Sequence, residues 1–307
     1  MKASSAQATI ERQLWSRFRS PSYWIGAVVP LVLIGLLLHQ AGSATSDPPT
    51  TMFLAVISAL WVGGSGCVRE VVDERRLVQR DPHLSLLAYA LAKILHAGLM
   101  AAGQSLILTM AVLLTGIVHI AAPMLWILLF LTTLAGALMA LVLSALCDEA
   151  ATALAWFPLL LVPQVVFGGF LFPYGHTIPF SPGRPVTVMP DALVREPVRN
   201  LLIQTAGVFT VSRWALEGYA AQVYARDLGN ADAFEEAAKV NVFLPATLAR
   251  EDVSRRLLDY ATGYSAVPSL HTWAPLYLVI LVFFAGAEAG ALVLIMPLRD
   301  PRRTVRT

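Results

Sequence analysis

Long apolar runs are the feature of this sequence that most restricts its fold. A helix needs about 20 mostly apolar residues to cross the hydrocarbon core of a bilayer, and only 14% of the 307 residues carry a charge. Spanning segments in lipid are helices or closed barrels, and runs this long without alternation are typical of helices. The sequence therefore predicts an all-α, polytopic membrane protein. The six predicted transmembrane helices are at residues 23–40, 52–68, 94–118, 124–146, 151–172 and 272–296.

The positions of Lys and Arg predict which side of the membrane each connection faces. These residues concentrate in cytoplasmic connections, whereas long translocated segments tolerate them. With the N-terminus inside, the short outer connections at 41–51 and 119–123 carry neither residue, and the long outer segment at 173–271 carries nine of the 22. We therefore predict that both termini are cytoplasmic.

Four regions follow from this topology. Residues 1–22 are predicted to be a cytoplasmic amphipathic segment, because large apolar residues recur every four positions among arginines. Residues 23–172 would hold the first five spans. Residues 173–271 would form a helical segment that is extracytoplasmic or re-entrant, because apolar periodic stretches run through it. Residues 272–307 would hold the sixth span and a basic cytoplasmic tail.

The densest charge lies between the second and third predicted spans, from Arg69 to Arg80. Arg69 and Asp73 are four residues apart and would face the same side of a helix. Pro82 disfavours helical backbone at the residue before it, and Ser85 is suited to cap the next helix. The stretch is either a solvated hairpin or a docking element for a soluble protein. Its spacing alone favours the hairpin, whereas its mixed signs fit a protein surface better than a lipid surface.

A serine motif raises a competing chemistry. Gly63 to Gly66 matches the Gly-x-Ser-Gly signature of rhomboid intramembrane proteases, but Ser65 would need a base within hydrogen-bond reach. One candidate base, His96, is predicted on the inner half of the third span, and the other, His271, lies across the membrane. Small-residue helix packing therefore explains the motif better than catalysis does.

Other functional classes lack a signal. No His or Cys spacing typical of a metal site occurs, and a net charge of +2 does not indicate nucleic-acid binding. We therefore expect no catalytic residue, no metal and no nucleic-acid partner.

Isolated polar residues within the predicted spans are candidates for a substrate pathway. An intramembrane carboxylate is costly and usually faces a cavity or a partner. Glu288 is the clearest case, and it lies between Gly286 and Gly290, which also make a small-residue packing face. Gln104 and Gln164 either line the same pathway or bond across helices.

The charged stretch and its surroundings resemble a known family. LWVGGSGCVREVVDERRLVQRDPHLSLLAYALAKIL resembles the second and third spans of type-two ATP-binding-cassette permeases, within the G-subfamily-like branch. That branch includes bacterial members in which a forkhead-associated domain and the ATPase are fused to the membrane domain. The resemblance rests on Trp61, Gly63, Arg69, Glu70, Val71, Val72, Glu74, Arg75, Arg80, Asp81 and the run from Ala88 to Lys93. Gln104-Ser105, FPLLLVPQVVFGGFLFPY at 157–174 and SRWALEGYA at 212–220 match in the same order.

The resemblance implies the membrane half of an ATP-driven exporter in the bacterial cytoplasmic (inner) membrane. The charged helix at about 69–82 would be a coupling helix seated on a cytoplasmic ATP-binding-cassette ATPase subunit. Six spans in one chain imply a homodimer in the lipid bilayer. No Gly-x-x-x-x-Gly-Lys-Ser/Thr loop occurs in the sequence, so either the ATPase is a separate chain or this chain is a membrane domain excised from a fused protein. ATP and Mg²⁺ would bind to the ATPase, and this chain would hold no cofactor.

Three groups of residues are then candidates for function. ATPase coupling would involve Arg69, Glu70, Asp73, Glu74, Arg75, Arg76 and Arg80. A substrate pathway would involve Trp61, Gln104, Gln164 and Glu288. Arg213 and Glu217, four residues apart, would pair on a helix entering the outer leaflet. The alternative functions are a membrane scaffold that transports nothing and a rhomboid-like serine protease.

Overall fold

The computed structural model of the protein describes residues 31–40, 48–80, 85–116, 120–168, 206–207, 209–216, 218–219 and 274–298. The predictions for residues 1–22, for the tail after 298 and for most of 173–271 lie outside these residues. Six helices account for most of the described chain: α3 (Pro48–Cys67), α4 (Glu70–Arg80), α5 (Leu86–Leu114), α6 (Ala122–Leu146), α7 (Ala150–Val166) and α13 (Ala274–Leu298).

The all-α prediction is confirmed in the described part of the chain, where all regular structure is helical. Four segments are long and apolar enough to cross a membrane: Thr51–Arg75, Leu86–Leu114, Ala122–Leu146 and Tyr277–Met296. Two shorter apolar helices, Leu31–Gln40 and Ala150–Val166, overlap the first and fifth predicted spans. The total of six spans stays a prediction.

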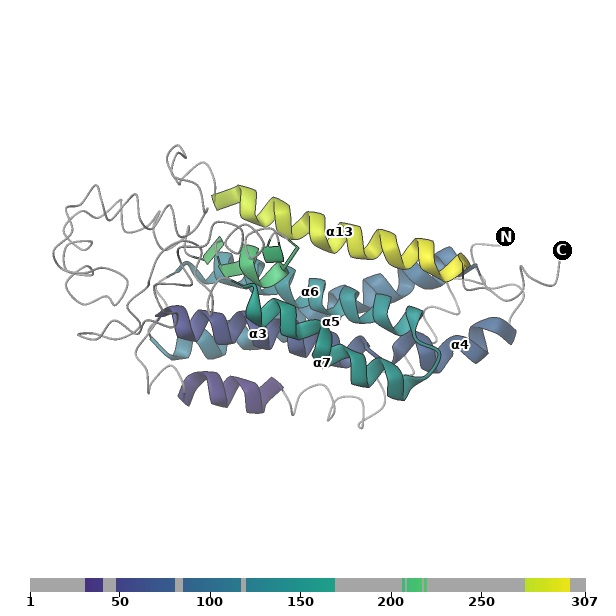
Figure 1. Ribbon diagram of the computed structural model, residues 1–307. Helices are drawn as coiled ribbons and strands as arrows, with labels where there is room; N and C mark the ends of the chain where they lie inside the picture. The colour runs from purple at the N-terminus through teal and green to yellow at the C-terminus, as the bar shows by residue number, and fades with distance from the viewer. Residues whose placement is uncertain are drawn as a thin grey trace, which may run out of the picture.

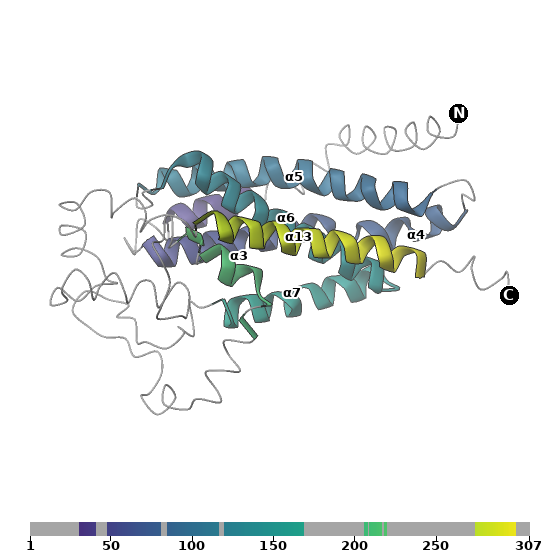
Figure 2. The same ribbon diagram turned by 90° about the horizontal axis from the view of Figure 1, so that it is seen from above.

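The long helices lie lengthwise beside one another (Figures 1 and 2). α4 extends from the C-terminal end of α3. The start of α5, the end of α6, the start of α7 and the end of α13 lie at this same end of the bundle, which we call the α4 end. The fold therefore gathers the charged connection and four helix termini in one place.

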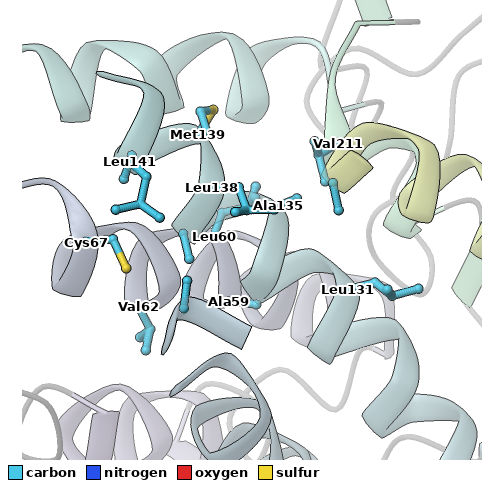
Figure 3. Packing of buried hydrophobic residues seen from close by; sticks show 14 of the residues in the cluster. Ala59, Leu60, Val62, Cys67, Leu131, Ala135, Leu138, Met139, Leu141 and Val211 are labelled. Atoms are coloured by element: carbon cyan, nitrogen blue, oxygen red, sulfur yellow. The ribbon is translucent and has the colours of Figure 1, made fainter. Parts of the chain in front are cut away.

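Helix α6 is the centre of the bundle, because it contacts each of the other five labelled helices. Figure 3 shows Ala59 and Leu60 of α3 beside Ala135 and Leu138 of α6. Small side chains let these two backbones approach closely, which is how helices associate where lipid removes the hydrophobic driving force. α13, by contrast, leaves most of its side chains unburied.

Glycines set the closest approaches in this packing. A Cβ atom at Gly136 would lie 2.5 Å from the carbonyl oxygen of Leu60, and one at Gly63 would overlap the carbonyl oxygen of Thr133. A Cβ at Gly64 would overlap the Phe157 ring. The packing interpretation of the glycine-serine motif is thus confirmed at its first two positions.

The start of α5 follows the sequence prediction only in part. α5 begins at Leu86, directly after Ser85 as predicted, and so extends eight residues before the predicted span at 94. Tyr89 and Lys93 in this added stretch are buried and contact α4. Ser85 occupies the N-cap position, but its side chain makes no capping hydrogen bond.

Candidate functional site

Helix α4 is the charged element predicted between the second and third spans. A two-residue break separates it from α3. Its first turn contains two acidic residues, which are favourable there because the N-terminal end of a helix carries partial positive charge. Val71, Val72 and Val78 are buried, so α4 packs one face on the bundle.

Another face of α4 is exposed and charged. Arg69 Nε lies 3.4 Å from Asp73 Oδ2, and the two side chains are 58% and 48% exposed. This is the pair predicted from the four-residue spacing, and it is confirmed. Such a pair contributes only about 0.3–0.5 kcal/mol, so its place on the surface matters more than its energy. The side chains of Arg76 and Arg80 lie outside the described residues.

Two carboxylates of α4 turn inward onto α5. Lys93 Nζ lies 3.1 Å from Glu70 Oε2 and 2.9 Å from each carboxylate oxygen of Glu74. The three side chains are 7%, 5% and 13% exposed, respectively. Desolvation offsets most of the attraction in a buried ion pair, but removing one partner leaves an uncompensated charge. This buried cluster therefore fixes α4 against α5.

Two more residues of α5 extend the buried cluster. The Tyr89 hydroxyl donates to Glu74 Oε2 at 2.9 Å, and His96 Nε2 lies 3.4 Å from Glu70 Oε1. These two contacts were not predicted from the sequence. The sequence does contain a pattern that could have indicated them. Tyr89, Lys93 and His96 are spaced four and three residues apart at the start of an apolar helix, which places them on one face.

α4 is also tied to the end of α6. The backbone N–H groups of Val71 and Val72 each donate to Ser144 Oγ at 3.1 Å. Arg75 Nη2 donates to the carbonyl oxygens of Ala145 and Cys147 at 2.9 and 2.7 Å, and Arg75 Nη1 lies 2.8 Å from Asp148 Oδ1. Ser144 gave no sequence signal, because a serine at a helix end is common.

The four candidate pathway residues lie on four different helices. Trp61 is 43% exposed and its ring centroid lies 5.8 Å from that of Phe157. Gln104 and Gln164 are buried. Glu288 Oε2 is buried and has no hydrogen-bond partner among the described residues. Within that part of the chain, no hydrogen bond, ion pair or ring contact joins any two of the four candidates.

Gln164 instead ties α7 to the segment at 209–216. Its Oε1 accepts the backbone N–H of Ser212 at 3.2 Å, and its carbonyl oxygen accepts the Ser212 hydroxyl at 2.5 Å. Arg213 is buried beside this contact, with its guanidinium carbon 5.2 Å from the Trp214 ring centroid. Glu217 lies outside the described residues, so the Arg213–Glu217 pair stays a prediction.

Among the described residues, the serine motif shows no catalytic geometry. Ser65 Oγ donates to the carbonyl oxygen of Val62 in its own helix at 3.1 Å. His96 faces Glu70, and His271 lies outside the described residues. No group of three His, Cys, Asp or Glu residues in the described chain is arranged to hold a metal.

Comparison with known proteins supplies the family. The model of the ABC-2 type transporter family matches residues 4–182, which is more than half of the chain. The ABC transporter ATP-binding/permease protein of Mycobacterium tuberculosis is 27% identical over 153 residues. That match covers 47% of this chain and 18% of the relative, so the chain spans less than a fifth of the relative's length. The chain is a multi-pass membrane component of a transporter and belongs to the ABC-2 type transporter family.

Proposed function

We propose that this chain is the permease subunit of an ATP-driven exporter and that α4 is its coupling helix. It would act as a homodimer with a separate ATP-binding-cassette ATPase subunit, which would bind ATP and Mg²⁺. Family membership supports a transporter permease, and the relative's name joins ATP binding to a permease in one protein. The chain would lie in the bacterial cytoplasmic membrane with both termini in the cytoplasm, as the Lys and Arg distribution favours.

The observation that carries the proposal is the two-sided character of α4. Its inward carboxylates, Glu70 and Glu74, are held by Lys93, whereas Asp73 and Arg69, the residue directly before the helix, are about half exposed. A helix that is rigidly anchored on one side and charged on the other is suited to receive force from a soluble partner. Polar contacts at the rim of such an interface would set partner choice and association rate.

This geometry changes which residues test the coupling role. Reversing the charge of Glu70 or Glu74 would break the buried cluster and disturb the permease itself. The exposed pair isolates the partner contact, because Arg69→Glu combined with Asp73→Lys keeps the net charge and the four-residue ion pair while inverting the surface pattern. Glu149→Lys is the matched control, since Glu149 is exposed near the same end of the bundle but lies outside α4.

We expect the exchanged pair to lose co-purification of the ATPase subunit by about tenfold or more, because like charges would meet across the interface. The Glu149→Lys control should retain the ATPase. Stimulation of ATP hydrolysis by the wild-type permease in lipid nanodiscs would distinguish a transporter from a scaffold. Wild-type co-purification and stimulation in the exchanged pair would show that α4 is not the coupling helix.

Glu288 is the proposed pathway residue that the structure supports best. A buried carboxylate oxygen without a described partner, on a helix in the membrane, is typical of a substrate or ion site. In this proposal Trp61 and Gln104 line the same route, whereas Gln164 has a structural bond to Ser212. Glu288→Gln should abolish the substrate-dependent part of ATP hydrolysis while leaving the melting temperature unchanged. Unchanged stimulation in that variant would remove Glu288 from the pathway.

A further inference from the structure

Helix α4 lacks an N-cap of its own. The first N–H groups of a helix have no partner within it, and Ser, Thr, Asp or Asn at the preceding position normally supplies one. That position is Arg69, which has no acceptor in its side chain. The missing acceptor comes from α6, where the Ser144 hydroxyl oxygen accepts the N–H groups of both Val71 and Val72 at 3.1 Å. Ser144 is fully buried.

The end of α6 has the complementary need, and α4 supplies it. The last carbonyl groups of a helix lack partners and carry partial negative charge, so a cation there is favourable. Arg75 places one guanidinium nitrogen 2.9 Å from the Ala145 oxygen and 2.7 Å from the Cys147 oxygen. Its other terminal nitrogen holds Asp148 at 2.8 Å. A guanidinium satisfies these acceptors together because its donors form a rigid fork.

We propose that Ser144 and Arg75 are positioning residues that join α4 to α6, so that the two helices move together when the ATPase acts on α4. Each helix end completes the hydrogen bonding of the other. α6 contacts all the other labelled helices, so displacement of α4 reaches the whole bundle through this joint. The inference rests on the proposed coupling role of α4. It also reassigns Arg75 from contact with the partner to contact within the permease.

The joint itself can be tested on the permease alone in lipid nanodiscs, by hydrogen–deuterium exchange. Ser144→Ala should raise the exchange rate of the amides at the start of α4 by about fivefold, the effect of losing a typical N-cap. Thr132→Val is the matched control, because Thr132 is also fully buried on α6 but its hydroxyl donates to the Leu128 oxygen of its own helix. Equal exchange in α4 for wild type, Ser144→Ala and Thr132→Val would overturn the joint.

Transmission is tested by adding the ATPase subunit with ATP and vanadate. In the wild type, exchange should change in both α4 and α6. In Ser144→Ala, and independently in Arg75→Gln, the change should persist in α4 but fall at least threefold in α6, with ATPase binding unchanged. If the two residues were merely structural, the variants would exchange faster in both helices, and the ATPase-induced change would fall equally in α4 and α6. If that change were the same in wild type and variants, transmission through the joint would be overturned. If the wild-type permease binds no ATPase, the proposed function fails and transmission fails with it, while the first experiment still decides the joint.

Discussion

Lys93 is the buried cation that holds two carboxylates of α4 at the α4 end. It is 7% exposed and contacts both Glu70 and Glu74. Removing a buried cation in this position leaves carboxylates desolvated without their counter-charge, which typically costs about 3–5 kcal/mol. The neutral replacement Lys93→Met is unbranched and only one heavy atom shorter, so most of the effect can be attributed to charge.

We therefore expect Lys93→Met to lower the melting temperature of the permease in nanodiscs strongly, whereas Leu91→Met, at an exposed position of the same helix, should leave it nearly unchanged. Adding Glu70→Gln and Glu74→Gln to Lys93→Met should recover part of the loss, because the carboxylates no longer need a counter-charge. If Lys93→Met alone melted at the same temperature as the wild type, the cluster would not anchor α4.

Glycine on α3 sets how closely the helices α3 and α6 can approach each other. Any side chain at Gly63 would meet the backbone carbonyl of Thr133, and backbone cannot move aside without separating the two helices. Gly103 on α5 has open space around its Cβ position. The two glycines thus separate the packing cost of a methyl group from its effect on helix propensity.

Gly63→Ala should destabilise the protein by about 1–3 kcal/mol, as overpacking of a filled contact does. Gly103→Ala should be neutral or stabilising by up to about 1 kcal/mol, because alanine favours helix over glycine. Thermal unfolding of both variants in nanodiscs provides the measurement. The packing interpretation would be contradicted by a Gly63→Ala protein that melts at or above the temperature of Gly103→Ala.

These elements also show what can be read from the sequence. The positions of α3, α6 and α13 could be predicted because apolar length alone defines a spanning helix, and the Arg69–Asp73 pair because it depends only on local spacing. The inward turn of Glu70 and Glu74 could not be predicted, since it depends on where Lys93 lies on another helix. Ser144 lies more than 70 residues from the amides that it caps, and no local pattern marks a cap supplied by another helix.

In the molecule as a whole, the described charges are concentrated at one end. Arg69, Asp73, Arg75 and Asp148 all belong to connections at the α4 end, whereas α6 begins at the other end with Ala121 at its N-cap position. The cytoplasmic side attracts Lys and Arg in short connections. The bundle therefore has a chemical polarity that sets its expected orientation, and the coupling proposal requires that the α4 end face the ATPase.

Cysteine labelling tests that orientation directly. Glu149 and Ala121 are both exposed and precede helices at opposite ends of the bundle, and the native Cys67 and Cys147 are buried, so background labelling should be low. A membrane-impermeant maleimide should label Ala121→Cys in intact spheroplasts and Glu149→Cys only in inverted vesicles. The wild-type chain controls for the native cysteines. The opposite labelling pattern would place α4 outside the cell, where no cytoplasmic ATPase could reach it, and would refute coupling through this helix.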